Sequence, residues 1–410
     1  MLIEFRFKNF KSFQDEQVLS MVAGSDKSLL DNVITDKALG KRRLVRSAVL
    51  YGANASGKSN LVDALDFVQS FVEGSAERKQ GAEIPVHLFR LDKTDDESPA
   101  EFEISFIHQG VRYQYGFSVD RKRVHEEWLI AYPKGLPQKW FERPVLGSLE
   151  SEWYFGPQLK GEKKRLVSVT RPDVLFLSEA ANFNHKQLSE VYGWFARYFR
   201  GTALASEQSV AQAIAEDKDF RAAMKDILRL ADLGILDFSV KETPFQQKHF
   251  DVRLWHQTQE RAGPGEPFSL EDESLGTRRF FILSYLWLCA LADGFTLVVD
   301  EMDTSLHPVL VRKLVSLFHN PDTNPQSAQL VFNTHDTTLL DSSLFRRDQI
   351  WFVEKDNAGA SHLYPLLEYS PRKGEALAKG YLQGRYGALP FIEEFAEGLL
   401  VNRDASDGET

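Results

Sequence analysis

The sequence predicts an α/β fold in which a mixed central sheet is joined to an antiparallel β lobe and a helical insertion. Three observations carry this prediction. Strands and helices alternate in the last third of the chain, as in a mostly parallel sheet covered on both faces. Strand-like segments separated by turns follow the first helix, as in an antiparallel meander. A helical pattern then fills the middle of the chain, between about Lys186 and Leu233.

The first part of the chain is predicted to form strands around one amphipathic helix. Residues 2–10 alternate between apolar and charged side chains, the period-two pattern of a half-buried strand. Ser47–Tyr51 is an apolar run that ends at a glycine, which indicates a buried strand. Apolar residues at helical spacing from Ser59 to Val72 predict the helix that follows. The meander is expected over residues 83–90, 101–107, 111–119 and 123–132.

The last part of the chain returns to strands and then alternates. Residues 235–242 and 249–257 are predicted to be strands. The elements expected after them are a helix at Thr277–Ala292, a strand at Phe295–Val299, a helix at His307–His319, a strand at Gln329–Phe332, and a closing pair at Gln349–Glu354 and Ser361–Pro365.

Composition restricts the class of protein. The 410 residues are 43% hydrophobic and 26% charged, as in a globular protein, and the length suits two or three structural units or one fold with an insertion. The longest apolar stretch, Phe280–Ala292, is shorter than the ~20 residues that cross a bilayer. The first residues lack the apolar block of a signal peptide, and the single Cys289 excludes an intrachain disulfide. We therefore expect a cytoplasmic protein without a membrane partner.

Charge argues mildly against a dedicated nucleic-acid binder. The chain has 49 Lys and Arg against 59 Asp and Glu, a net charge of −10, whereas nucleic-acid binders are usually basic. Two local basic runs, Lys41–Arg43 and Lys160–Arg165, are open to either interpretation, a solvated loop or a local anion-binding patch. We interpret both as solvated loops.

A phosphate-binding loop is the strongest motif. Residues 52–59 read GANASGKS, which fits the pattern GxxxxGK[ST], with a buried strand before it and an amphipathic helix after it. Gly52 and Gly57 let the backbone curl so that its N–H groups point at phosphate oxygens. Lys58 is placed to reach the β- and γ-phosphates, and the Ser59 hydroxyl to ligate Mg²⁺. The sequence therefore predicts a binding site for a nucleoside triphosphate.

An acidic pair completes the expected site. The apolar strand before Asp300 and Glu301 ends in carboxylates, and such a strand end beside a nucleotide loop holds Mg²⁺. Asp300 is expected to hold the ion and Glu301 to polarise the attacking water. Lys58 and Asp300 lie far apart in the sequence, so a large insertion must separate the two elements. His335 follows another buried strand and is expected near the γ-phosphate.

A second anion-binding turn lies before the apolar helix. The segment ESLGTR places the Ser274 hydroxyl and the Gly276 amide at a helix N-terminus. Because Lys58 already binds one end of the nucleotide, this turn is expected to close over the γ-phosphate of a nucleotide bound to another subunit. The loop that begins at Asp303 is expected to contact that subunit as well.

This ordered set of motifs resembles the ABC-type ATPase head: GANASGKS, ESLGTR, LVVDEMDTSLH and FNTHD. The opening IEFRFKNFKSF is similar to the first strand of the SMC, RecF and OLD branch of these proteins. Within that branch the chain resembles compact bacterial AAA-type ATPases of the RloA and AbiL kind, from phage-defence and abortive-infection operons. The resemblance implies a P-loop NTPase fold of the ABC-head type. It implies an ATPase lobe over residues 1–180, a helical insertion over 181–240 and a second lobe over 241–410.

The resemblance also implies roles for individual residues, with ATP and Mg²⁺ as ligands. The residues expected to bind nucleotide are Gly52, Asn54, Ala55, Ser56, Gly57, Lys58, Ser59 and Asn60. The signature residues expected to act in trans are Ser274, Gly276 and Arg278, with Asp303 in the dimer loop. Ser59 and Asp300 are expected at the metal, with Glu301 as catalytic base and His335 as γ-phosphate switch. The signature reads SLGTR where transporters and condensins have a serine followed by two glycines. The glutamine that couples Mg²⁺ to the lobe interface is not located, since Gln69 and Gln80 lie in the wrong context and Gln109 is expected in a hairpin turn.

The function expected from this resemblance is an ATP-binding and ATP-hydrolysing molecular switch. Two or more copies are expected to associate head to head around ATP and to control a separate effector, a nuclease or toxin, in anti-phage defence. The trigger is expected to be a nucleic acid or a phage protein. Neither an HNH spacing nor a TOPRIM-like carboxylate cluster is recognised in the sequence, so the output is expected to pass through the partner. The alternatives are a RecF-like clamp on duplex DNA and a scaffold that does not hydrolyse ATP.

Overall fold

The computed structural model describes residues 1–91, 98–144, 153–201, 206–230, 234–243, 249–256, 267–372 and 374–389. Its centre is a six-stranded sheet with the order β11-β15-β16-β5-β17-β18. The first five strands run parallel, and β18 pairs antiparallel to β17. These strands are β11 (Phe199–Gly201), β15 (Thr296–Val299), β16 (Gln329–Asn333), β5 (Ser47–Tyr51), β17 (Ile350–Lys355) and β18 (Ser361–Pro365).

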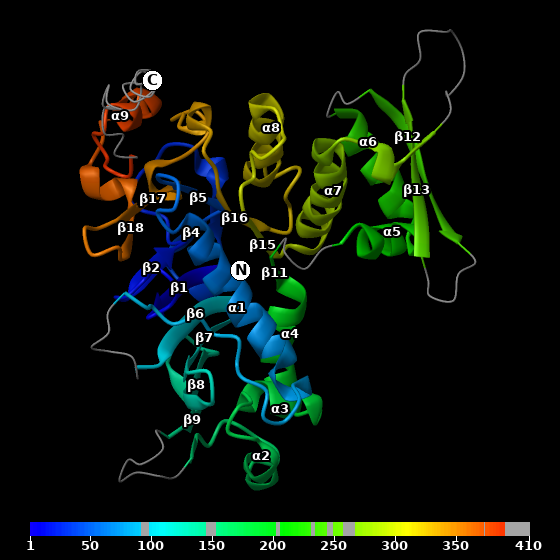
Figure 1. The fold of residues 1–410 in the computed structure, drawn as a ribbon. Helices are drawn as coiled ribbons and strands as arrows, with labels where there is room; N and C mark the ends of the chain where they lie inside the picture. The colour runs from blue at the N-terminus through cyan, green and yellow to red at the C-terminus, as the bar shows by residue number, and fades with distance from the viewer. Residues whose placement is uncertain are drawn as a thin grey trace, which may run out of the picture.

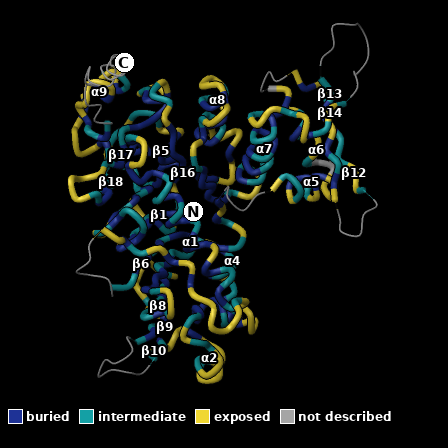
Figure 2. Tube along the Cα trace, in the orientation of Figure 1, coloured by how far each residue is buried: buried dark blue, intermediate teal, exposed yellow. Residues whose placement is uncertain are grey.

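Helices cover both faces of this sheet (Figure 1). Successive residues of the central strands point to opposite faces, so Val298 and Val331 lie in one hydrophobic core while Leu297 and Leu330 lie in the other. The first core includes residues of α1 (Lys58–Gly74), and the second includes residues of α7 (Leu275–Asp293) and α8 (Pro308–His319). The predicted mostly parallel sheet with two covered faces is confirmed, and the central strands are buried along their whole length (Figure 2).

A seven-stranded antiparallel sheet forms the second layer, with the order β10-β9-β8-β7-β6-β1-β2. One face of it packs on α1 and α4 through aromatic side chains such as Phe102, Phe106 and Phe117, and the other face is polar. Its strands are β1 (Leu2–Lys8), β2 (Gln17–Ser20), β6 (Ala100–His108), β7 (Val111–Val119), β8 (Val124–Tyr132), β9 (Gln138–Arg143) and β10 (Tyr154–Phe155). A small pair, β3 (Val33–Thr35) and β4 (Arg43–Val45), lies beside it.

The remaining helices and strands surround the two layers. A three-stranded sheet packs against α5 and α6 and lies at one side of the molecule (Figure 1). It contains β12 (Ile235–Thr243), β13 (His249–His256) and β14 (Phe268–Ser269). The other helices are α2 (Lys164–Val169), α3 (Phe176–Asn182), α4 (Lys186–Tyr198), α5 (Glu207–Glu216), α6 (Lys218–Leu230) and α9 (Leu377–Leu382).

Two segments differ from the sequence prediction. Residues 83–90 form no strand: Ile84 and Val86 are buried, but the Ile84 N–H bonds the Arg121 carbonyl and Pro85 has no N–H to give to a ladder. Phe199, expected to end a helical run, begins the edge strand β11 instead, and the strand ends at Gly201, where an interruption of the helical pattern is expected. A Cβ at Gly201 would collide with the Asp66 carboxyl of α1, so this close approach requires glycine there.

Helix α7 is the one helix of the described segments that is long and apolar enough to cross a bilayer by length and composition. Its buried residues, among them Phe280, Phe281 and Trp287, lie in the second core with α5, α6 and β15. It is therefore the central helix of that core.

Candidate functional site

The phosphate loop connects the carboxyl end of β5 to the first turn of α1, as predicted. Gly57 caps α1 with φ of 116°, and Ala55 also has a left-handed φ of 60°. A Cβ at Gly52 would collide with the Val353 carbonyl oxygen, and one at Gly57 would lie 2.5 Å from Ser361 Oγ. Both glycines are therefore required by close approach of the surrounding chain.

Two serines distant in sequence support the loop. Ser361 Oγ donates to the Ser56 carbonyl at 2.6 Å and lies 2.8 Å from Ser12 Oγ. The Asn60 amide donates to Ser12 Oγ at 2.7 Å. Hydrogen bonds therefore lead from the Asn60 side chain through Ser12 and Ser361 to the loop. Sequence reasoning missed both serines, because their contacts join three distant segments: β18, the segment after β1, and α1.

Lys58 is buried within the loop. Its Nζ donates to the carbonyl oxygens of Gly52 and Ala53, both at 2.9 Å. Burial lowers the pKa of Lys58, and the carboxylates of Asp300, Glu301 and Asp303 act in the opposite direction. The same three carboxylates therefore lie close enough to Lys58 to stabilise its charged form.

Asn333 connects the two predicted acidic residues. It ends β16 beside β15, and its amide nitrogen donates to Asp300 Oδ1 at 2.5 Å. Its amide oxygen accepts from the Glu301 N–H at 2.5 Å. Glu301 has a left-handed φ of 48°, a conformation that costs a non-glycine residue of order 1 kcal/mol or more and that clusters at functional sites. Asn333 thus holds Asp300 and Glu301 in one arrangement.

Arg279 joins the acidic residues to helix α7. Its Nη2 donates to the backbone carbonyls of Asp300 and Glu301, both at 2.7 Å. Because Arg279 lies near the N-terminal end of α7, one turn after the signature turn, it links this end of the helix to the end of β15. Sequence reasoning named its neighbour Arg278 and missed Arg279.

The loop and the acidic end line one pocket of about 520 Å³. It is lined by residues 54–60, Glu301, His335 and Lys355, the last being a cation that sequence reasoning missed. The His335 N–H bonds the Asp303 carboxylate at 3.2 Å, so the predicted switch and dimer-loop residues are in direct contact. The structure therefore brings the predicted phosphate-binding, base and switch residues to the carboxyl edge of the parallel strands.

The signature turn lies outside the lining of that pocket. Ser274 Oγ caps α7 by accepting from the Thr277 N–H at 3.1 Å, and Leu275 beside it is 77% exposed. A Cβ at Gly276 would lie 2.8 Å from the Ser305 carbonyl, so the turn packs on the loop after Asp303. Arg278, expected to act in trans, pairs with Glu207 of α5 at 2.7 Å within its own chain.

The three glutamines considered at the sequence level lie away from the pocket. Gln69 accepts from the Gly201 N–H and thereby fixes the edge strand β11 to α1. Gln109 lies in the turn between β6 and β7, as expected, and bonds Glu190. Gln80 follows α1 on the surface.

The donors at the pocket suit Mg²⁺ bound with a nucleotide. Mg²⁺ favours hard oxygen ligands and is commonly held by one or two protein side chains, with phosphate oxygens and waters completing six positions. Ser59 contributes a hydroxyl at the pocket wall. Asp300 is not one of the lining residues, but it directly precedes Glu301, which is, and Asn333 bonds only its Oδ1. Ser59 and Asp300 are thus a chemically fitting pair for the ion.

Comparison with protein families decides the assignment. Residues 47–341 match the family described as "AAA domain, putative AbiEii toxin, Type IV TA system". The chain belongs to this AAA-domain family. The mixed, mostly parallel sheet with its glycine-rich loop between β5 and α1 fits the P-loop NTPase fold that the sequence predicted for this AAA-domain protein. The family match places it in the ATPase superfamily.

Solved structures similar to this AAA-domain protein are SMC heads. One is the SMC head domain from Thermotoga maritima, with a TM-score of 0.41 and 14% identity, covering 89% of this chain and 98% of that chain. Another is the Smc head domain with an extended coiled coil, bound to the C-terminal domain of ScpA and derived from Pyrococcus furiosus. It has a TM-score of 0.41 and 14% identity, covering 90% and 97%. No curated protein matches the chain.

Proposed function

We propose that this protein is an ATPase switch that closes head to head with a second copy around ATP·Mg²⁺ and controls a separate effector. One observation carries the proposal. The pocket at the carboxyl edge of the parallel strands brings the phosphate loop, Glu301 and His335 together from three distant parts of the sequence. Membership of an AAA-domain family supports ATP as the nucleotide.

The chemistry proposed is attack of water on the γ-phosphorus. The backbone N–H groups of residues 54–59 and the Lys58 ammonium bind the phosphate oxygens. Glu301 accepts a proton from the attacking water. The oxygen of that water bonds to the γ-phosphorus, and the bond between this phosphorus and the bridging oxygen of ADP breaks. His335 would donate a hydrogen bond to the γ-phosphate. Ser59 and Asp300 would hold Mg²⁺, which would supply positive charge beside the phosphates.

The exposed signature turn supports the head-to-head arrangement. Ser274 and Leu275 face solvent and do not line the pocket of their own chain. In a two-fold pair, the Ser274 hydroxyl and the Gly276 amide of one copy close over the γ-phosphate held by the other. ATP then favours association, because its γ-phosphate accepts charge-assisted hydrogen bonds that ADP cannot accept.

The effector is proposed to be a separate nuclease or toxin in bacterial anti-phage defence. The words "toxin" and "Type IV TA system" in the family description support a role of this class. The closer kinship to RloA and AbiL proteins, a nucleic-acid or phage-protein trigger and a cytoplasmic location are parts of the same proposal. Co-purification of the product of the neighbouring reading frame with the ATP-bound form tests this part.

The switch itself is tested with two variants that act at different steps. Glu301→Gln keeps the phosphate loop and removes the base, so it is expected to form a stable dimer in ATP with at least ~100-fold slower phosphate release. Lys58→Ala is expected to stay monomeric in ATP. Light scattering after gel filtration and a phosphate-release assay measure the two quantities, with Glu368→Gln on the exposed surface as control. Identical assembly of both site variants would contradict the proposal.

A further inference from the structure

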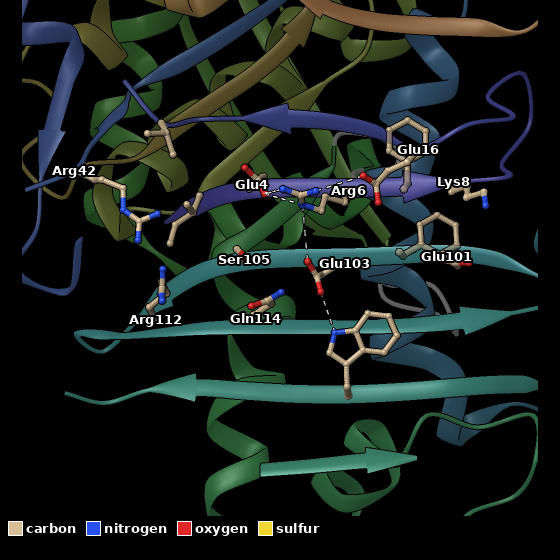
Figure 3. Close-up of a pocket in the computed structure, with 15 residues that line it drawn as sticks. Glu4, Arg6, Lys8, Glu16, Arg42, Glu101, Glu103, Ser105, Arg112 and Gln114 are labelled. Atoms are coloured by element: carbon tan, nitrogen blue, oxygen red, sulfur yellow. Dashed lines mark hydrogen bonds and ion pairs between the residues drawn. The ribbon is translucent and has the colours of Figure 1, made fainter. Parts of the chain in front are cut away.

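The polar face of the seven-stranded sheet carries a second hollow, of about 450 Å³, away from the phosphate loop (Figure 3). Strands β1, β6, β7 and β8 supply most of its lining, and Arg42 reaches it from the turn before β4. The opposite face of the same strands is packed in the first core. The hollow is therefore built on a rigid sheet.

In the middle of the hollow, one arginine lies among three glutamates. Arg6 lies 2.8 Å from Glu4, 3.4 Å from Glu16 and 4.0 Å from Glu103. The Trp128 indole N–H donates to Glu103 at 3.0 Å, and Figure 3 shows these contacts running from β1 over β6 and β7 to β8. A Cβ at Gly116 would collide with the Trp128 ring, so the glycine gives the indole room to reach Glu103.

One end of the hollow is positively charged. Arg42 and Arg112 lie there together with Ser105 and Gln114 (Figure 3). Within the described residues, neither guanidinium makes an ion pair or a hydrogen bond. The Arg112 guanidinium lies over the Tyr132 ring, 3.6 Å from its centroid, which fixes its position. Burial lowers the pKa of Arg112, and the nearby positive charge of Arg42 acts in the same direction.

The neutral groups at this end can also donate. Gln114 Oε1 accepts from the Tyr132 hydroxyl at 2.9 Å, which leaves its amide nitrogen free to donate toward a ligand. Ser105 is paired with Gln114 across β6 and β7, so its hydroxyl lies on the same face. Two guanidinium groups, an amide and a hydroxyl form the donor set that phosphate oxygens accept from.

We propose that this hollow is a second anion site, which binds a small phosphorylated ligand of nucleotide size through Arg42 and Arg112. The volume lies in the range of small-ligand pockets. Glu4, Glu101 and Glu103 lie farther along the hollow and would repel the continuous phosphates of a nucleic-acid strand, which favours a compact ligand. The site is independent of ATP hydrolysis at the phosphate loop.

The test measures pyrophosphate binding to the full chain by titration calorimetry at low salt. All proteins carry Lys58→Ala, which weakens anion binding at the phosphate loop. The parent is expected to bind pyrophosphate, and adding Arg42→Gln with Arg112→Gln is expected to weaken binding at least ~10-fold. Adding Lys8→Gln removes one positive charge at the far end of the hollow (Figure 3), as Arg42→Gln alone does at the near end, and is expected to change affinity less than ~2-fold.

Three outcomes would overturn the proposal. The first is equal pyrophosphate binding by the parent and the double-arginine protein. The second is an equal loss with Lys8→Gln, which would indicate general surface charge. The third is arginine-dependent binding of a 20-nucleotide single strand that is tighter than binding of pyrophosphate, which would make the ligand a nucleic acid. If the double variant unfolds, Arg42→Gln alone decides, because Arg42 is an exposed turn residue.

Discussion

Asn333 positions both acidic residues of the pocket through one amide group. Its nitrogen donates to the Asp300 carboxylate and its oxygen accepts from the Glu301 backbone. Removal of the amide leaves the Glu301 N–H without its acceptor and frees the Asp300 side chain. We expect Asn333→Ala to lower ATP turnover about 10–100-fold, as for other residues that orient metal ligands, with little change in ATP affinity. Turnover of the folded fraction and binding of a fluorescent ATP analogue measure this.

Asn324 provides the matched control. It is equally buried, and its amide bonds the carbonyls of Phe318 and Ala328 far from the pocket. Asn324→Ala is expected to lower thermal stability without changing the turnover of the folded protein. Equal turnover of the two alanine variants would show that Asn333 has only a structural role.

His319 makes stability depend on pH. It is buried beside Ser47 and Gln349, and burial lowers its pKa to about 3. Between the unfolded value of about 6.5 and pH 3, the unfolded chain binds a proton that the folded imidazole does not, so the free energy of unfolding falls as the pH falls. The contribution approaches about 1.4 kcal/mol per pH unit within this window.

Urea unfolding at pH 7.5, 6.0 and 5.0 measures this dependence. His319→Gln is expected to flatten the slope between pH 6.0 and 5.0, while His87→Gln, at an exposed position, is expected to keep the slope of the original protein. An unchanged slope in His319→Gln would show that carboxylates alone set the acid sensitivity.

At the scale of elements, the phosphate loop depends on the strand packed behind it. The Val353 carbonyl of β17 occupies the space that a side chain at residue 52 would need, and Ser56 Oγ lies 2.6 Å from the same point. Gly52→Ala is therefore expected to destabilise the protein by about 1–3 kcal/mol and to weaken ATP binding at least ~10-fold. Thermal unfolding and titration with the ATP analogue measure the two effects.

Gly74 at the end of α1 is the control for this substitution. A Cβ there meets no atom within 4 Å, and its φ of −108° suits any residue. Gly74→Ala is expected to leave ATP binding unchanged and to stabilise α1 by up to about 1 kcal/mol. Loss of ATP binding in both variants would place the effect of Gly52→Ala in the helix rather than in the loop.

The elements that could be predicted are those with a local pattern. The alternation of Ser47–Tyr51 with α1, and of α7, β15, α8 and β16, follows from apolar spacing within each segment. The edge strand β11 could not be predicted, because three residues carry no period and only pairing with β15 makes them a strand. The segment 83–90 has the alternation of a strand, but its backbone bonds go to other loops.

The residues of the site also fall into two groups, those with a local sequence pattern and those without one. The loop at 52–59 and the pair Asp300–Glu301 have local signatures, so the sequence placed them at strand ends before any contact was known. Asn333, Arg279 and Ser361 reach the site only because distant segments meet at the sheet edge. A polar residue that ends a buried strand next to the acidic strand was the one available signal for Asn333.

At the scale of the whole molecule, the surface turn and the acidic pair are mechanically connected. Arg279 bonds the carbonyls of Asp300 and Glu301, while Gly276, three residues earlier, packs on the loop after Asp303. A second copy that contacts Ser274 can therefore affect Glu301 by two routes, through Arg279 and through the loop after Asp303. The proposed switch needs such a connection, since assembly must control hydrolysis.

Mixing two inactive variants tests whether the pocket is completed by a second copy. In the proposed arrangement, each nucleotide site consists of the phosphate loop of one copy and the signature turn of the other. Lys58→Ala disables the phosphate-loop half of a site, and Ser274→Arg blocks the signature half with a long charged side chain. In a two-fold dimer of one copy of each, one site carries both defects and the other carries none. An equimolar mixture is therefore expected to show ATP turnover that neither variant shows alone, at most about half of the original, since each mixed dimer has one intact site of two.

A mixture of Lys58→Ala with Glu301→Gln is the control. Both of these defects lie in the same half, so each site of the mixed dimer carries one of them and the mixture is expected to remain inactive. Recovery in the first mixture and not in the second assigns Ser274 to the site of the opposite copy. Full turnover by Ser274→Arg alone, or no recovery in a mixture shown by light scattering to contain dimers, would contradict completion in trans, because the signature turn would then have no part in the partner's pocket.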